Sequence, residues 1–411
     1  MATLRIGLFV ENQITAGGAF QQTLSAIQAI SKHLSSHEVV IMTTTKDNVK
    51  ALQEKNVQAE LFNAGPLVRF FDSLSGLMPR LDVVLTFFQR VGLRHIGCNL
   101  DFRLKELRID IALFNARSAT ALRLSTHPFV ITVWDICHRD FPEFPEVSYN
   151  REFERREQLL KALLPKALAV IVNAPSEIDD IANLYQINRE RIVLIPFLPS
   201  VAVRRHSEGL GTTSSQAVRT RYNLITDFVF YPAQFWPHKN HVYVLDALVA
   251  LKNKHDVRLH AVFCGSDKGW GEHIFRTAGK LGIADQVHML GFVPDDDIPA
   301  LYEAAIALAF PTYFGPTNLP PVEAALLGCP VIYSDLPAFR EQMGDAALYC
   351  DLRNPESMAD QLYSLITDSA LVERLRQAGY KRATALDESL YYHRLNKIID
   401  DYAYMQRRWH A

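Results

Sequence analysis

Short apolar runs rich in branched residues alternate along the chain with stretches in which apolar positions recur at helical spacing. This alternation is typical of a parallel β-sheet that is covered by helices on both faces. Two series of strands are predicted, the first at residues 5–10, 38–43, 110–115, 129–134, 169–174 and 191–197 and the second at residues 228–233, 259–264, 287–292, 305–310 and 330–335. The pattern therefore predicts an α/β protein with two doubly wound domains.

A segment without periodicity separates the two series. Residues 200–217 are rich in Gly, Ser and Thr, which is typical of a linker. We therefore expect a first domain over residues 1–199 and a second over residues 218–385. Residues 386–411 follow as a helix with an aromatic face. The length agrees with this division, because 411 residues exceed what one hydrophobic core usually holds.

Composition and charge narrow the class of protein. A net charge of −2 offers no broad basic surface, so we expect no nucleic-acid partner. No apolar run reaches the roughly 18 residues of a membrane helix, and the chain starts without the plan of a secretion signal, so we expect a cytoplasmic protein. The five cysteines are odd in number and form no C-x-x-C pair, which argues against a disulfide framework and a zinc site.

One turn predicts a binding site for a nucleotide. Phe310–Pro330 joins a hydrophobic strand to a short helix through Gly, Pro and Asn, and such a turn aims backbone amides at an anion. Because Pro316 has no N–H, the donors are expected from Thr317–Leu319. Glu323 lies about one turn inside the helix, where its carboxylate can accept hydrogen bonds from two ribose hydroxyls.

Doubly wound domains bind ligands at the carboxyl ends of their strands, and two glycines lie at such an end. Gly17 and Gly18 follow the first strand and precede a helix, where they let a phosphate approach the helix N-terminus. The dinucleotide fingerprint G-x-G-x-x-G is absent there, which counts against a nicotinamide-dependent dehydrogenase.

The turn at Phe310–Pro330 resembles the signature of family 4 retaining glycosyltransferases of the GT-B fold, and the resemblance extends over nearly the whole chain. That signature carries two glutamates separated by seven residues. Glu323 stands at the second position, with Leu319 and Pro320 also matching, whereas Gly315 stands at the first. In the family, the first glutamate contacts the donor sugar. The resemblance implies two Rossmann-like domains facing across a cleft, with the C-terminal helix crossing back to the first domain.

The resemblance also implies which residues bind the donor. Lys239 matches the lysine that clamps the donor phosphates, and His238 before it adds a pH-dependent charge. The Gly17–Gly18 loop faces the diphosphate. The base and ribose are expected to contact the backbone of Gly265, Ser266, Phe292 and Val293. The remaining donor contacts are expected from residues of the signature turn, Gly315, Thr317, Asn318 and Leu319.

A polar cluster follows the strand at residues 129–134 in the first domain. Aligned with the family on Asp135, the chain has Trp134 where many members have a histidine, and His138 is expected to reach into the cleft instead. We predict Asp135, His138, Lys239 and Glu323 as the catalytic group. Trp134 is expected to stack on an acceptor sugar, with Arg139 beside it.

Residues 66–108 mix aromatic residues with seven basic ones. A basic aromatic face fits docking on an anionic membrane surface, and lipid-linked acceptors are common in the family. An ordinary solvated face is the other interpretation of the same pattern.

These observations together predict a retaining, metal-independent hexosyltransferase without a cofactor. Its donor is a nucleotide sugar, GDP-mannose ahead of UDP- and dTDP-sugars, and its acceptor is a glycan or lipid-linked glycan of cell-surface polysaccharide or lipopolysaccharide. The acidic run Asp295–Asp297 is interpreted as a helix start and not as a metal site. Two alternatives stay open: a sugar-nucleotide epimerase, and a non-catalytic GT-B partner that binds a nucleotide sugar or glycan.

Overall fold

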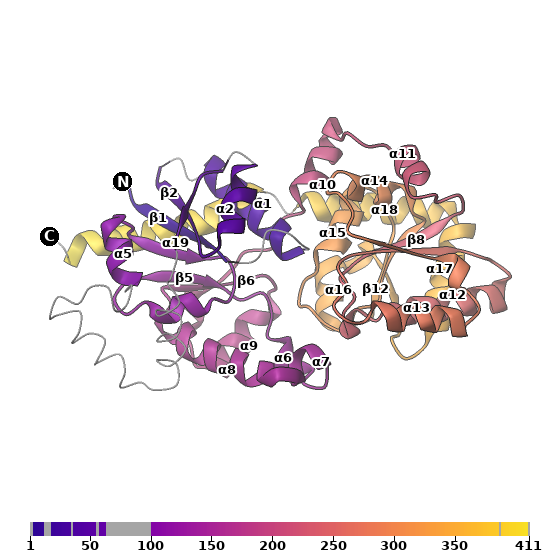
Figure 1. Cartoon of the computed structure of the whole chain (residues 1–411), viewed down its shortest axis with the longest axis horizontal. Helices are drawn as coiled ribbons and strands as arrows, with labels where there is room; N and C mark the ends of the chain where they lie inside the picture. The colour runs from indigo at the N-terminus through magenta and orange to yellow at the C-terminus, as the bar shows by residue number, and fades with distance from the viewer. Residues whose placement is uncertain are drawn as a thin grey trace.

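The computed structural model describes residues 3–11, 18–33, 36–54, 57–62, 100–385 and 388–409. These residues form two lobes that lie side by side along the long axis of the molecule (Figure 1). The strands are β1 (Arg5–Val10), β2 (Glu38–Thr43), β3 (Ala59–Leu61), β4 (Ile111–Phe114), β5 (Phe129–Thr132), β6 (Ala169–Val172), β7 (Ile192–Leu194), β8 (Phe228–Pro232), β9 (His260–Cys264), β10 (Val287–Gly291), β11 (Ala307–Phe310), β12 (Val331–Ser334) and β13 (Leu348–Cys350).

Helices surround both groups of strands. They are α1 (Gly18–His33), α2 (Lys46–Gln53), α5 (Leu100–Glu106), α6 (Cys137–Asp140), α7 (Pro145–Ser148), α8 (Glu152–Leu163), α9 (Ser176–Tyr185), α10 (Val201–Arg205), α11 (Ser215–Arg221), α12 (His241–His255), α13 (Gly271–Lys280), α14 (Asp297–Ala304), α15 (Leu319–Leu326), α16 (Pro337–Met343), α17 (Pro355–Thr367), α18 (Ser369–Thr384) and α19 (Glu388–Trp409). Several begin at a side-chain cap. Asn354 accepts a hydrogen bond from an amide at the start of α17, and Asp368 does so for α18.

Each lobe is built on one parallel sheet. In the part of the chain that the structure describes, the first sheet has seven strands in the order β3-β2-β1-β4-β5-β6-β7, and the second has six in the order β10-β9-β8-β11-β12-β13. Every predicted strand is present, and the edge strands β3 and β13 are additional. Strands β4, β5 and β6 are buried along their whole length because helices cover both faces of the sheet.

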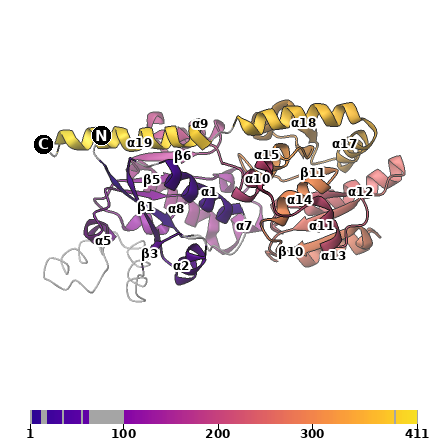
Figure 2. The same ribbon diagram turned by 90° about the horizontal axis from the view of Figure 1, so that it is seen from above.

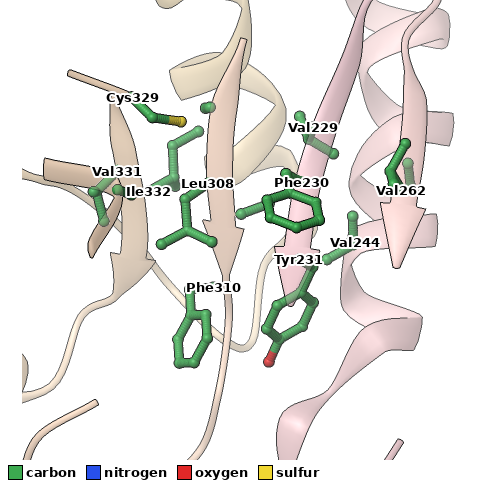
Figure 3. Packing of buried hydrophobic residues seen from close by; sticks show 14 of the residues in the cluster. Val229, Phe230, Tyr231, Val244, Val262, Leu308, Phe310, Cys329, Val331 and Ile332 are labelled. Carbon is green, nitrogen blue, oxygen red and sulfur yellow. The ribbon is translucent and has the colours of Figure 1, made fainter. Parts of the chain in front are cut away.

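The second lobe has one continuous hydrophobic core. Val229, Leu308 and Ile332 project from adjacent strands and are fully or almost fully buried (Figure 3). Near the carboxyl ends of β8 and β11, the rings of Tyr231 and Phe310 meet edge to face at a centroid distance of 4.9 Å. This core therefore extends to the edge of the sheet at which a ligand of a doubly wound domain binds.

Two segments show how the lobes are joined. Residues 200–217 fold onto the second lobe, because Val203 of α10 is fully buried in its core and Val218 of α11, which follows the segment, is buried there too. The C-terminal helix α19 returns to the first lobe, where Leu395 and Ile399 are buried against β1 and its neighbours (Figure 2). The predicted fold class, two Rossmann-like domains with a returning C-terminal helix, is confirmed.

None of the helices in the described ranges combines the length and the apolar character that crossing a bilayer requires.

Candidate active site

A cleft of about 1420 Å³ lies between the two domains. Residues after the ends of β8, β9, β10 and β11 line one side, and we call residues 232–323 the second-domain wall. The opposite side is lined chiefly by the segment after β5, and we call residues 134–156 the first-domain wall. The cleft therefore lies where ligands of doubly wound sheets bind.

Lys239 is held on the second-domain wall by two contacts. Its Nζ donates a hydrogen bond to Oδ1 of Asn318 at 3.3 Å and lies 5.3 Å from the centroid of the Phe310 ring. Burial lowers the pKa of Lys239 to about 8. An anion in the cleft would favour the charged form and raise this pKa, so this ammonium group is suited to phosphate.

The signature turn is organised by Asn318. Its Oδ1 accepts from Lys239, its Nδ2 donates to the Tyr333 hydroxyl at 2.7 Å, and its backbone N–H donates to Oε1 of Gln342 at 3.2 Å. The prediction that the Thr317–Leu319 amides all serve an anion is therefore wrong for Asn318. Gly315 has a φ of 114°, and a Cβ there would lie 3.0 Å from the Asn318 side chain, which explains the glycine.

Glu323 lies in α15 and lines the cleft, but both of its oxygens already have partners. Oε1 accepts from the backbone N–H of Ser200 at 2.9 Å, and Oε2 accepts from the Tyr302 hydroxyl at 3.3 Å. Burial raises the pKa of this carboxyl, although the bond from Ser200 opposes the shift. A carboxylate offers about four lone-pair directions, so these bonds leave acceptor capacity for a ribose hydroxyl. Glu323 also fixes the start of α10.

The residues expected at the base and ribose lie together on the second-domain wall. Gly265, Ser266, Phe292 and Val293 all line the cleft. A Cβ at Gly265 would lie 2.4 Å from the carbonyl oxygen of Ala233, so only glycine fits at that point of the wall. Phe292 is 72% exposed, whereas Val293 is buried. The exposed ring is available to a planar base.

Trp134 and Asp135 lie on the first-domain wall, facing the same cleft. Burial disfavours the charged form of Asp135, but the guanidinium groups of Arg117 and Arg156 outweigh it and lower the pKa of this carboxyl. Oδ1 of Asp135 also accepts from the N–H of Cys137 at 3.2 Å. Asp135 is therefore a fixed negative charge in the cleft.

The structure corrects the prediction for His138 and Arg139. His138 is fully buried, and its Nε2 is 2.9 Å from Oε1 of Glu157 in α8. Arg139 donates to the same carboxylate at 2.7 and 2.5 Å, and the Tyr185 hydroxyl donates at 2.9 Å. Neither His138 nor Arg139 lines the cleft, because Glu157 draws both side chains towards α8 and α9. We call these four residues the Glu157 cluster.

Sequence reasoning missed a contact between the two walls. Glu146 of α7 accepts hydrogen bonds from both the backbone N–H and Nδ1 of His238, and the backbone bond is 3.2 Å long. Burial lowers the pKa of His238 to about 4, against the effect of Glu146. His238 is therefore neutral at pH 7, which differs from the pH-dependent charge that was expected beside Lys239. Because Glu146 lies in a four-residue helix that follows a Pro- and Phe-rich segment, no spacing in the sequence links it to His238.

Aromatic rings extend this contact between the walls. The His238 imidazole stacks on Phe314 at a centroid distance of 3.9 Å, and Phe314 lies 5.6 Å from both Phe141 and Phe144 of the first domain. Phe144 also lies 5.3 Å from Tyr313. The walls thus meet over an apolar contact at one end of the cleft.

Four buried polar atoms in the cleft have no hydrogen-bond partner among the described residues. They belong to both walls and include donors as well as acceptors: Trp134 Nε1, Glu146 Oε2, Ser266 Oγ and Thr317 Oγ1. Buried polar atoms are usually paired, so unpaired ones that line one cleft indicate a polar ligand. A sugar, with several hydroxyl groups, has the matching chemistry.

Some predictions lie outside the described residues. Gly17 is outside them, and Gly18 is the first residue of α1. Of the basic segment 66–108, only residues 100–108 are described. Within the described ranges no group of three metal-ligating side chains is found, and the absence of a metal and of a cofactor stays a prediction. The acidic run is a helix start, because α14 begins at Asp297.

Comparison with solved structures gives the same architecture over the whole chain. The crystal structure of Anabaena Alr3699/HepE in complex with UDP and glucose has a TM-score of 0.71 and 17% identity, covering 97% of this chain and 100% of that one. The structure of WaaG, a glycosyltransferase involved in lipopolysaccharide biosynthesis, has a TM-score of 0.66 and 16% identity, covering 96% and 99%. At these identities the likeness concerns the fold.

Sequence relatives match over a shorter part of the chain. The O-antigen chain mannosyltransferase B of Escherichia coli is 27% identical over 258 residues, which are 62% of this chain and 65% of that protein. The D-inositol 3-phosphate glycosyltransferase of Corynebacterium diphtheriae is 24% identical over 261 residues, 62% and 61% respectively. The matches thus span less than two thirds of either relative. The family model for glycosyl transferases group 1 matches residues 220–382. Residues 220–382 of this chain are therefore a group 1 glycosyl transferase domain.

Proposed function

We propose that the chain is a retaining glycosyltransferase that moves a sugar from a nucleotide sugar to a hydroxyl group of a glycan. The observation that carries the proposal is the partly buried ammonium group of Lys239, fixed by Asn318 beside α15 in a domain of the group 1 family. A partly buried cation at the carboxyl edge of a doubly wound sheet is suited to a diphosphate. Glu323, further into α15, is suited to the ribose.

The chemistry asks little of the protein beyond positioning and charge. The bond between the anomeric carbon and the diphosphate oxygen breaks, and the acceptor oxygen bonds to that carbon on the same face. The leaving phosphate takes the acceptor proton. Lys239 stabilises the charge that develops on the diphosphate, and this interaction is strong because the site is buried. No protein nucleophile takes part in this scheme.

On the first-domain wall, Asp135 and Trp134 are proposed to face the reacting sugars. Asp135 is ionised and held by Arg156, so it can stabilise positive charge at the anomeric carbon. The Trp134 indole offers an apolar face to a sugar ring and an unpaired N–H to a hydroxyl. Trp134 is therefore proposed as the acceptor platform.

For the donor and acceptor, the named relatives supply the finer proposal. The Escherichia coli relative is a mannosyltransferase of the O-antigen chain, which supports GDP-mannose and a surface-polysaccharide acceptor. The Anabaena neighbour was crystallised with UDP and glucose, so UDP-glucose is the competing donor. A lipid-linked acceptor and a peripheral position on the inner face of the cytoplasmic membrane belong to the same proposal.

One observation keeps a second candidate, a non-catalytic partner that binds a nucleotide sugar. Gly315 stands at the first signature glutamate, and its φ of 114° disfavours any side chain there. If the cleft lacks a group that binds the transferred sugar, nucleotide binding would occur without turnover.

The first test measures thermal stabilisation by GDP, UDP, dTDP, ADP and CMP in parallel. A ligand that binds only the native state raises the melting temperature once its concentration exceeds the dissociation constant. We expect one nucleotide to stand out and its effect to be lost in Glu323→Ala. Transfer from the matching nucleotide sugar then separates the enzyme from the non-catalytic partner. No shift with any nucleotide at millimolar concentration would contradict nucleotide binding.

A further inference from the structure

Glu146 is a buried carboxylate with only one of its oxygens in use. Its side chain is 8% exposed, and Oε1 receives both hydrogen bonds from His238. Oε2 is buried and has no partner among the described residues, although the side chain lines the cleft. Hydrogen bonds from His238 outweigh burial and hold the pKa of Glu146 below its ordinary range. A buried carboxylate oxygen without a donor is costly, so its partner is expected from a ligand.

The contacts around Glu146 fix which part of the cleft it serves. Its partner His238 stacks on Phe314, which precedes Gly315 in the signature turn. The Cys137 thiol of the first domain lies within hydrogen-bonding reach of the Gly315 backbone. Glu146 therefore lies at the end of the cleft where the two walls meet over the signature turn. Phe292 and Val293, proposed for the base, follow β10, and β9 and β8 separate β10 from β11, which precedes this turn.

Charge excludes one class of partner for Oε2. Glu146 and Asp135 are both ionised carboxyls of the first-domain wall, so a phosphate beside Oε2 would be repelled. Lys239, which follows His238 in the chain, is the cation suited to the phosphates. The hydrogen-bond donor that remains for Oε2 is a neutral hydroxyl group. The sugar attached to the diphosphate would supply hydroxyl groups next to Lys239.

We propose that Glu146 Oε2 accepts a hydrogen bond from a hydroxyl of the transferred sugar. This inference rests on the proposed function. The first domain then supplies the carboxylate for the donor sugar that the second domain lacks at Gly315. The sugar site is complete only when the two walls are in contact, because the carboxylate and the phosphate-binding lysine come from different domains.

A purely structural role is the competing interpretation, in which Glu146 only holds His238 and keeps the walls together. The two interpretations differ in the ligand that a substitution affects. A sugar-binding carboxylate acts on a nucleotide sugar and leaves the free nucleoside diphosphate unaffected. A structural contact acts on both ligands to the same extent, because it changes the cleft as a whole.

The test is calorimetric titration of the full chain with two pairs of ligands, GDP with GDP-mannose and UDP with UDP-glucose. Glu146→Gln keeps the shape of the side chain and an acceptor for His238 but removes the charge. We expect Glu146→Gln to weaken binding of the nucleotide sugar about tenfold to a hundredfold, as for a hydrogen bond to a charged group. Binding of the matching nucleoside diphosphate should change by less than about twofold.

Glu143→Gln is the matched control, because Glu143 is an exposed glutamate three residues before Glu146. It should bind both ligands of each pair as the wild type does. Equal weakening of both ligands in Glu146→Gln, or no weakening of either, overturns the inference. If the wild-type chain binds none of the four ligands, the proposed function fails instead, so the two failures are distinguishable.

A second measurement does not depend on the folding of a variant. Monodeoxy analogues of the donor sugar are titrated into the wild-type chain, and the analogue that lacks the hydroxyl bound by Glu146 should bind about tenfold or more weakly. The same analogue should show no further loss in Glu146→Gln. If every monodeoxy analogue binds the wild-type chain as the parent donor does, the inference is overturned.

Discussion

The two walls of the cleft hold their polar side chains in different ways. On the second-domain wall, Lys239 and Glu323 follow strand ends. Asn318 fixes Lys239, and Tyr302 and Ser200 fix Glu323, where Ser200 begins the segment that folds onto the second lobe. On the first-domain wall, Glu146 is fixed by His238 of the other domain. The second-domain wall is therefore built within one domain, whereas part of the first-domain wall depends on the contact between the two.

This difference assigns separate tasks to the two domains. A wall that is built within one domain can bind the nucleotide before the domains meet. A wall that needs its partner domain can select the sugar only afterwards, which protects an activated donor from water until the cleft is assembled. The comparison predicts that nucleotide affinity responds to substitutions in the second-domain wall and sugar selection to those in the first-domain wall.

The strongest expected effect is at Lys239. Lys239→Ala removes the ammonium group that is proposed to face the diphosphate, and the loss of one such preorganised group should lower kcat/KM by about a hundredfold to a thousandfold. Nucleotide affinity should fall with it, because the same charge binds the ground state. Steady-state transfer and calorimetric titration of the nucleoside diphosphate measure the two effects.

Lys252→Ala is the control for this prediction. Lys252 lies on α12, its side chain is 54% exposed, and it pairs with Asp256 four residues on. Its removal should leave kcat/KM and nucleotide affinity unchanged. If Lys239→Ala behaves like Lys252→Ala, the second-domain wall does not bind the diphosphate, and the division of tasks between the walls fails.

The second-domain wall was the more predictable one for a physical reason. Its residues follow hydrophobic strands, and in a doubly wound sheet the carboxyl ends of parallel strands meet at one edge. The family resemblance singled out Lys239, Gly265 and Val293, and the order of the strands accounts for their lying on one wall of the cleft. Much of this wall is backbone, as at Gly265, where no side-chain orientation had to be predicted.

The first-domain wall shows what a sequence pattern leaves open. His138 lies only three residues after Asp135, yet His138 turns away because Glu157 in α8 accepts its hydrogen bond. The orientation of the His138 side chain depends on Glu157, which lies 19 residues away in the sequence and belongs to no motif. The edge strands β3 and β13 were missed for a simpler reason, since three residues are too few to show a period of two.

The Glu157 cluster lies behind the first-domain wall, and its contribution to the stability of the fold can be measured. Hydrogen bonds from Arg139, His138 and Tyr185 outweigh burial and lower the pKa of Glu157 from 4.5 to about 2. A depressed pKa contributes stability that is present above pH 4.5 and is lost as the pH falls towards 2. Glu157→Gln should therefore lower the free energy of unfolding by about 2–3 kcal/mol at pH 7. The deficit should shrink below pH 4.

Calorimetric unfolding at several pH values measures this deficit, and Glu154→Gln is its control. Glu154 is exposed on the same helix, so its substitution should leave stability nearly unchanged. Donor affinity should be the same in both variants, because the Glu157 cluster lies behind the first-domain wall. A loss of donor affinity in Glu157→Gln would instead indicate that His138 acts in the active site.

The smallest expected effect is a pH dependence of nucleotide binding, and it tests the second-domain wall without changing its shape. The pKa of Lys239 is about 8 because the side chain is buried, and a bound diphosphate raises it by favouring the charged form. Below pH 8 the proton is already present. Above pH 8 binding must take up a proton, so the dissociation constant should rise about tenfold from pH 7 to pH 9.

Lys239→Arg is the control, because it keeps its charge over this range, and titration of the nucleotide itself affects both proteins equally. If the dissociation constant of Lys239→Arg rises with pH as that of the wild type does, the titrating group is not Lys239. The proposal that the second-domain wall binds the phosphates through Lys239 would then fail.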